Sequence, residues 1–424
     1  MTLLLFASLI VALAIGVPIA FALGLSSLVY LLFTDIPINI IPQRMFSGID
    51  SFVLLCVPGF VLAGNLMNVG GITHRIIAFC MAVVGHIRGG LALANVGASM
   101  LFAGISGTAV AETASIGAVM IPSMVRQGYR ADYAAALTAS ASTVGPIIPP
   151  SLPMIIAGTI SGLSVSRLLI AGAIPGILLG VSLGSVAYLI ARRNDHPKGP
   201  RVPFREVVRS FFGAFWAILM TLIIVVGIMS GVFTPTEASM VAVVYAIFIG
   251  FFVYRELKPR DLPRVFWDSA VTTASLMALV GFANVFAWIL TTEEIPVKVA
   301  QAMLGFSSSP VVFVLLVNLL LLFVGTFMET IAALMILLPI LLKVAVALGI
   351  DPIQFSVMCV LNLVVGLTTP PVGVCLFVAS SISRVPLAPL TRAVLPFLGV
   401  SIAVLLLVSY VPQITLWLPG LMYK

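Results

Sequence analysis

The chain has 424 residues, of which 61% are hydrophobic and only 8% are charged. Many apolar runs approach the ~20 residues that a helix needs to cross a bilayer, and they are apolar on every side, whereas the strands of a transmembrane β-barrel would alternate. The composition therefore predicts an all-α polytopic membrane protein. Its net charge of +7 is expected to orient the helices in the lipid bilayer and not to bind nucleic acid.

In chain order, the first element is the apolar run at residues 1–20, which has no basic residues before it and is predicted as a membrane crossing and not a cleaved signal. Two hydrophilic segments, 191–209 and 254–264, are rich in Lys and Arg and are expected to be cytoplasmic. Residues 73–88 are too poor in apolar residues to span the bilayer, so we expect an interfacial arm helix there. The predicted crossings are 2–17, 18–33, 51–69, 133–160, 168–191, 211–232, 236–253, 265–290, 353–380 and 390–418, with re-entrant segments at 91–125 and 311–345.

The four cysteines lie within apolar segments, far apart in the sequence and without the spacing of metal ligands. We interpret them as small buried hydrophobic side chains and expect no cofactor. They are Cys56, Cys80, Cys359 and Cys375.

The two halves of the chain repeat one pattern of glycines, prolines and acids. Glu112 and Pro122 match Glu329 and Pro339 at an offset of 217 residues, and the match continues after a four-residue insertion. Chance similarity between Leu- and Val-rich helices is the alternative, but it would match aliphatic residues only. Each half has five predicted crossings, an odd number, so the copies are expected to be inverted, which is a transporter architecture. The later matches pair Gly145, Pro149 and Pro150 with Gly366, Pro370 and Pro371.

We predict one domain for each repeat. The first covers residues 1–209, with scaffold helices, the arm helix 73–88, a hairpin at 91–125 and a broken helix at 133–160. The second covers residues 210–424, with scaffold helices, a hairpin at 311–345 and a broken helix at 353–380.

Each hairpin needs a turn at membrane depth, and the sequence supplies one. In "GISGT", residues 104–108, glycines permit the bend and hydroxyls satisfy freed backbone groups, while Gly325 and Thr326 form the second turn. Each turn opens a half-helix whose free N–H groups favour an anionic group. A substrate carboxylate is therefore expected near Thr108 and Thr326, and near Ser151 after the first proline break.

A proline-broken crossing accompanies each hairpin. Because proline has no N–H, Pro149 is expected to leave the Gly145 carbonyl without its helical partner, and Pro370 to do the same to Gly366. Unpaired carbonyls in a dry bilayer cost several kcal/mol, and a hard monovalent cation such as sodium is their natural occupant. The alternative is that the Pro-Pro pairs only kink their helices and a neighbouring hydroxyl satisfies the carbonyls. The side-chain oxygens expected to complete the cation sites are those of Ser106 and Thr369.

Two acids lie inside the predicted hairpins. Glu112 and Glu329 come early in the outgoing half-helices, where a helix N-terminus stabilises a carboxylate, so a structural role and a role in ion coupling are both open. In "FTPTEA", by contrast, Thr234, Pro235 and Glu237 have the spacing of a capping box, which predicts a structural role for Glu237.

The sequence also resembles a known family over nearly its whole length. The segments "HIRGGLALANVGASMLFAGISGTAVAETASIG" (86–117), "GPIIPPS" (145–151), "SGVFTPTEAS" (230–239) and "GIDPIQFSVMCVLNLVVGLTTPPVGVCLFVAS" (349–380) look like the large membrane subunit of the tripartite ATP-independent periplasmic (TRAP) transporters. One departure is Gly107-Thr108, where the family often has Gly-Ser, and it keeps the hydroxyl.

The resemblance implies sodium-driven import of a small organic acid, typically a C4-dicarboxylate or a sialic acid, across the bacterial inner membrane. It implies an elevator motion of the hairpins and broken helices against a scaffold. It also implies two partners, a soluble periplasmic binding protein that delivers substrate and a separate small membrane subunit, since the chain starts directly at the large subunit's first helix. The positions that match the family's cation sites are Ser106, Gly145, Ile148 and Pro150 in the first half and Gly325, Gly366, Thr369 and Val372 in the second.

Other functions fit the sequence less well than transport does. An intramembrane serine protease could use Ser106 as its nucleophile, but it needs a base, and His74, His86 and His196 are expected at interfaces or in a cytoplasmic loop. A primary pump would need a phosphate-binding loop, G-x-x-x-x-G-K-[ST], which the chain lacks. A channel fits hairpins but not a paired inverted site, and proton coupling through the two hairpin acids is the main rival to sodium. We therefore expect a secondary active transporter and not an enzyme.

Overall fold

The computed structural model describes residues 2–34, 36–196, 198–199, 201–295, 298, 309–326, 328–370 and 372–423, with only the backbone described at 2 and 104–106. The described chain is built from helices, so the predicted all-α class is confirmed. With η for short 3₁₀ or π turns, the elements are α1 (Thr2–Ala14), α2 (Ile19–Leu32), α3 (Ile40–Ile49), η1 (Phe52–Leu55), α4 (Cys56–Val69), α5 (Ile72–Val84), α6 (Gly90–Ser106), α7 (Ala109–Arg126), α8 (Ala131–Ala141), η2 (Ser142–Val144), α9 (Leu152–Ser161), α10 (Val165–Arg193), α11 (Phe204–Met229), α12 (Pro235–Phe248), η3 (Ile249–Val253), η4 (Pro259–Asp261), α13 (Leu262–Thr292), α15 (Pro310–Gly325), α16 (Thr330–Ala347), α17 (Pro352–Gly366), α18 (Val374–Ser383), α19 (Leu387–Tyr410) and α20 (Gln413–Met422).

Seven helices among the described residues are long and apolar enough to cross a membrane, which confirms a multi-pass membrane protein. They are Phe52–Val69, Val165–Arg193, Phe204–Met229, Pro235–Val253, Pro259–Thr292, Thr330–Ala347 and Leu387–Tyr410. The predicted crossing at 390–418 is wrong in its second part. α19 ends at Tyr410 and α20 begins at Gln413, because Pro412 between them has no N–H to continue the helix.

Two helix pairs occupy the segments predicted as hairpins. α6 ends where Gly107 adopts a left-handed conformation with φ of 63°, and α7 begins two residues later. In the second pair, α15 ends at Gly325, and the Glu329 carboxylate caps α16 by accepting hydrogen bonds from the backbone N–H groups of Ile331 and Ala332, at 2.8 and 3.3 Å.

Two further segments are interrupted helices. α8 passes through η2 into an irregular stretch around Pro149, and α9 resumes with Ser151 as its N-cap. α17 ends at Gly366, and α18 begins after Gly373, whose φ is 60°. Both interruptions place backbone polar groups outside regular helical hydrogen bonding, deep in an apolar bundle.

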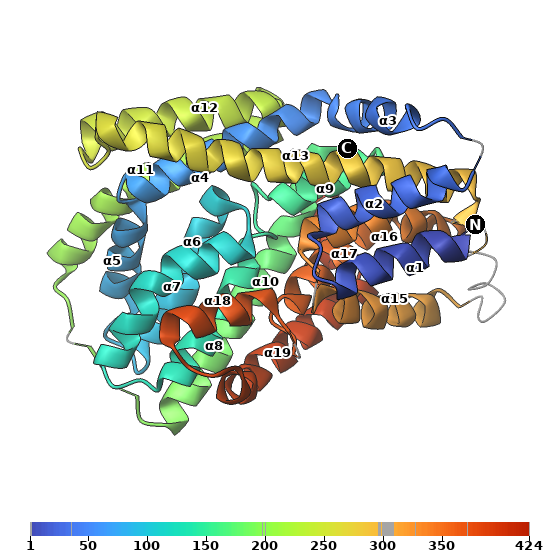
Figure 1. Ribbon diagram of the computed structural model, residues 1–424. Coiled ribbons are helices and arrows are strands. Elements are labelled where there is room, and N and C mark those ends of the chain that lie inside the picture. The colour runs from blue at the N-terminus through green and yellow to red at the C-terminus, as the bar shows by residue number, and fades with distance from the viewer. Residues whose placement is uncertain are drawn as a thin grey trace.

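Helices from the two halves of the chain pack against each other in the interior. α7 from the first half packs on α18 from the second, while α16 from the second half packs on α9 from the first. Figure 1 shows α13 running the length of the molecule beside α4 and α12, with the paired and interrupted helices lying beneath this layer. The division into two inverted domains at residue 209 stays a prediction, which this reciprocal packing supports.

Two smaller predictions are confirmed. Thr234 and Glu237 form a capping box at the start of α12, with each side chain bound to the other residue's backbone N–H. The four cysteines are buried, between 0% and 7% exposed.

Candidate functional site

Glu112 is a buried acid in the first hairpin segment. It lies in the first turn of α7, its side chain is 0% exposed, and neither carboxylate oxygen has a partner among the described residues. The hydroxyl of Ser99 on α6 lies beside the carboxyl group and favours its charged form, although no hydrogen bond of standard geometry joins the two groups. A buried ionised carboxylate in this condition costs several kcal/mol, so the side chain must be neutralised by a proton or by a cation.

The Glu112 carboxyl group rests against the break in the α8–α9 segment. A Cβ atom built on Gly145 would overlap Oε2 of Glu112, so only glycine leaves room for the carboxyl group here. No described residue donates a hydrogen bond to the Gly145 carbonyl, as predicted from the missing N–H of Pro149. The next carbonyl, that of Pro146, is taken by the Ser151 hydroxyl. An acid and an unpaired carbonyl therefore meet at one glycine.

Hydroxyl and thiol groups connect this acid to the second half of the chain. Thr113 and Ser142 share a hydrogen bond of 2.5 Å between their hydroxyl oxygens, and the Cys375 thiol at the start of α18 lies against both. The beginning of α18, from the second half of the chain, therefore packs against the hydroxyl pair beside Glu112.

The second half has a related but different arrangement. The backbones of Gly325 and Gly366 are in direct contact: a Cβ built on Gly366 would lie 2.6 Å from Cα of Gly325. Just beyond this contact, the N–H of Gly373 donates to the Thr326 carbonyl at 2.8 Å, which ties the end of α15 to the start of α18. The prediction that the Gly366 carbonyl lacks a partner is wrong. It accepts the Thr369 N–H at 2.9 Å, because the chain tightens into a 3₁₀-type turn before Pro370.

The remaining predicted ligands differ in how far the structure supports them. The Thr369 hydroxyl donates to the Val365 carbonyl at 3.0 Å, and the Thr326 hydroxyl donates to the Phe323 carbonyl at 2.8 Å, so both oxygens keep acceptor capacity. The Ser151 hydroxyl donates to the Pro146 carbonyl and accepts the Met154 N–H that it caps at the start of α9, which is a structural role; its role as a substrate ligand stays a prediction. Thr108 precedes α7 in extended conformation.

For four of the positions predicted as cation ligands, the structure gives a location but no evidence for or against a role in binding. The Ser106 side chain lies outside the described residues. Pro150 is buried, Ile148 packs against Gly176 of α10, and Val372 is partly buried.

Sequence reasoning missed Ser99, Thr113, Ser142 and Cys375. Each is a small polar residue in an apolar helix, which was the available signal, but their meeting depends on how α6, α7, η2 and α18 pack together.

A separate cavity of about 340 Å³ lies between the α3–η1–α13 side of the molecule and the α9–α16 side. Its polar lining comes from Ser47, Ser51, Thr159 and Asn284, and its apolar lining includes Met335 of α16. The Asn284 amide donates to the Arg44 carbonyl at 2.7 Å, so that side chain is fixed in place. Water-accessible space thus lies between part of α13 and the pair formed by α9 and α16.

Comparisons with known proteins agree with this arrangement. A family model described as "Tripartite ATP-independent periplasmic transporter, DctM component" matches residues 6–414. The chain is 44% identical over 407 residues to the sialic acid TRAP transporter large permease protein SiaM of Vibrio cholerae, covering 96% of this chain and 95% of that one. It is also 44% identical over 400 residues to the C4-dicarboxylate TRAP transporter large permease protein DctM of Pseudomonas aeruginosa, covering 94% of each. Among solved structures, the YdaH transporter of Alcanivorax borkumensis superposes with a TM-score of 0.59 at 16% identity, covering 91% of this chain and 90% of that one, a likeness of fold alone.

Proposed function

The chain belongs to the DctM component family of the tripartite ATP-independent periplasmic transporters, and on that basis we propose that it imports a small organic acid together with sodium ions. The relatives' names support two substrate classes, sialic acids and C4-dicarboxylates. The word "tripartite" supports two further components, which we expect to be a small membrane subunit and a soluble periplasmic binding protein. The place of action would be the bacterial inner membrane.

One observation carries the sodium assignment: the Glu112 carboxyl group has no hydrogen-bond partner among the described residues and rests against Gly145, whose carbonyl has no donor there either. A monovalent cation would satisfy both groups at once and would cancel the charge of the buried acid. The second proposed site, around Gly366 and Thr369, would rely on carbonyl and hydroxyl oxygens.

The cavity between α13 and the pair formed by α9 and α16 supports an elevator motion. Bodies that slide past each other need an interface that is not fully packed, and the space beside Asn284 and Thr159 is of that kind. In this proposal the paired and interrupted helices move as one body, and the layer containing α4, α12 and α13 stays with the scaffold.

The test is the thermal stability of the purified protein across a sodium titration at constant ionic strength, with potassium or choline as the replacement. A ligand that binds only the folded state adds about 2.7 kcal/mol at 100 times its Kd, so we expect a saturable rise specific for sodium. Glu112→Gln should lose most of this rise, whereas Glu206→Gln, an exposed acid at the start of α11, should keep it.

The same buried acid also favours a second candidate, proton coupling, since a proton would neutralise Glu112 as well as a cation would. In that case sodium and potassium would stabilise equally, and stability would follow pH in the wild type but not in Glu112→Gln. Uptake of sialic acid and C4-dicarboxylates by proteoliposomes that contain the two partner components would then identify the substrate.

A further inference from the structure

A basic groove lies away from the proposed transport site, where the ends of α8, α10 and α19 meet. It is a cavity of about 670 Å³, and three arginines from distant parts of the chain line it: Arg130, Arg193 and Arg392. The Lys- and Arg-rich segment 191–209 at this end predicts that it lies on the cytoplasmic side of the membrane. Nothing in the proposed transport cycle uses this groove.

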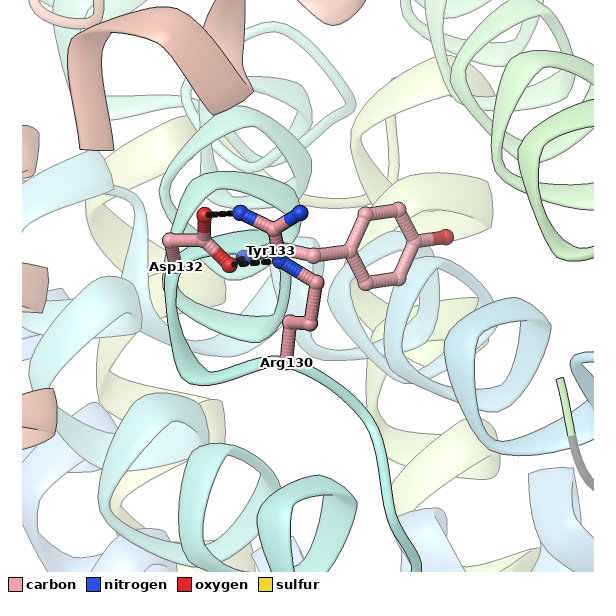
Figure 2. Close-up of polar contacts among 3 residues, drawn as sticks. All are labelled: Arg130, Asp132 and Tyr133. Atoms are coloured by element: carbon pink, nitrogen blue, oxygen red, sulfur yellow. Dashed lines mark hydrogen bonds and ion pairs between the residues drawn. The ribbon is translucent and has the colours of Figure 1, made fainter. Parts of the chain in front are cut away.

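Charge in the groove is poorly balanced. Arg130 donates two hydrogen bonds to Asp132, from Nε to Oδ1 at 3.1 Å and from Nη2 to Oδ2 at 2.5 Å, so this pair is neutral. Figure 2 shows the guanidinium of Arg130 held against the Asp132 carboxylate, with the ring of Tyr133 extending away from the pair. Arg193 and Arg392 are exposed and form no ion pair with any residue that the structure describes.

The closest acid in sequence to Arg193 does not cancel its charge. Asp195 is bound instead by Arg88, with Nη1 and Oδ1 2.5 Å apart. A helix start adds further positive potential, because α19 begins at the groove after Pro386 and has no side-chain cap in the described chain. Pro389 has no N–H, so the first-turn groups that favour an anion are the N–H groups of Leu387 and Ala388.

One wall of the groove is apolar. Ile190 of α10 and Pro396 of α19 line it, and the neighbouring Leu189 and Leu395 are exposed on the outer surface. A small inorganic anion would contact only the arginines and would leave the apolar wall exposed. A phospholipid would contact both, because its phosphate would lie among the arginines while its glycerol and upper acyl chains would cover the apolar side.

We propose that Arg193 and Arg392 bind the phosphate of an anionic phospholipid from the cytoplasmic leaflet, seated in the groove between α8, α10 and α19. The bound lipid joins these three helices at one end. Because α8 follows the first hairpin segment directly, the lipid also fixes the base of that hairpin.

The experiment measures the apparent melting temperature of the purified full chain in detergent while phosphatidylglycerol is titrated in. Phosphatidylcholine and inorganic phosphate are titrated in parallel, and native mass spectrometry counts the bound lipids. The variant is Arg193→Gln with Arg392→Gln. The matched control is Arg205→Gln with Arg209→Gln, which removes the same charge from exposed positions outside the groove.

We expect phosphatidylglycerol to stabilise the wild type and the control. Each basic residue at an anionic lipid surface contributes a factor of about five in affinity, so the variant, which lacks two of them, should bind phosphatidylglycerol about 25-fold more weakly. Equal stabilisation of variant and wild type, or an equal effect of phosphatidylcholine, would overturn the proposal. An equal effect of inorganic phosphate at the same concentration would overturn the lipid as the source of the phosphate.

A second variant keeps the test decisive if the double variant does not fold. Asp132→Asn frees Arg130 from its partner and raises the positive charge of the groove, so phosphatidylglycerol should bind about five-fold more tightly. Unchanged or weaker binding in Asp132→Asn would count against the groove as the site.

Discussion

Replacing Gly366 by alanine tests whether the ends of α15 and α17 meet as closely as the structure shows. The new Cβ would lie 2.6 Å from Cα, 2.8 Å from C and 3.1 Å from O of Gly325, all of them backbone atoms that cannot rotate away. Ordinary contacts of a Cβ begin at 3.4 Å, so α15 and α17 must separate by 3.4 minus 2.6, or 0.8 Å, at this point. Overpacking of this kind costs about 1–3 kcal/mol.

The same separation would strain the proposed second cation site. The N–H of Gly373 donates to the Thr326 carbonyl just beyond the glycine contact, so a shift of α15 away from α17 also strains the 2.8 Å hydrogen bond that ties the end of α15 to the start of α18. We therefore expect Gly366→Ala to lower both the stability of the protein and its response to sodium.

The assay is the melting temperature of the purified protein with and without saturating sodium. Gly399→Ala is the matched control, because a Cβ on that α19 glycine meets nothing within 4 Å, and it should leave the melting temperature unchanged or raise it slightly. Wild-type stability and wild-type sodium response in Gly366→Ala would refute the close contact and the reasoning built on it.

Three further predictions follow from single side chains. His196 is buried against the Tyr129 ring, with centroids 4.5 Å apart, and burial lowers its pKa from 6.5. Its contribution to stability is therefore full above pH 6.5 and is lost as the pH falls below it, so the amide protection factors at residues 194–196, corrected for the intrinsic exchange rate at each pH, should be lower at pH 5.5 than at pH 7.5. Equal protection factors at the two pH values would contradict this. Ser106→Ala and Thr369→Val should each weaken the sodium-dependent stabilisation with expression intact, and an unchanged response in both would remove these hydroxyls from the site. Glu329→Gln should lower stability by about 1 kcal/mol through the weaker helix cap and leave the sodium midpoint unchanged, so a shifted midpoint would show that Glu329 is a ligand.

Local signals in the sequence located much of the architecture. The capping box at Glu237 needs only the spacing of its own residues, and the proline in "GPIIPPS" interrupts its helix whatever packs around it. The glycine at 107 likewise ends α6 through its own left-handed backbone. Such features are encoded within a few residues of where they act.

Features that depend on tertiary packing were not predicted. The sequence pattern gave no reason to expect α3 at Ile40–Ile49, and it treated the segment around Pro412 as continuous helix. The contact between Gly325 and Gly366 joins residues that lie 41 positions apart, and the partner of the Gly366 carbonyl depends on how the following turn closes. No spacing rule within one helix contains this information.

The two hairpin acids show how a repeated sequence produces unequal chemistry. At the offset of 217 residues, the start of α7 at Ala109 corresponds to position 326, but α16 begins at Thr330, which is 330 minus 326, or four residues later. About one turn of helix is therefore missing at the start of α16.

Because α16 begins later, Glu329 is the N-cap of its helix, whereas the aligned Glu112 lies inside the first turn of α7. The Glu329 carboxylate accepts hydrogen bonds from the first N–H groups of α16. The Glu112 carboxylate accepts none from any residue that the structure describes. If each half holds a cation, the first site includes a formal negative charge and the second has only neutral oxygens. Since charge dominates the affinity of oxygen ligands for hard cations, the first site should bind first and more tightly. The order of ion binding would then follow from one turn of helix.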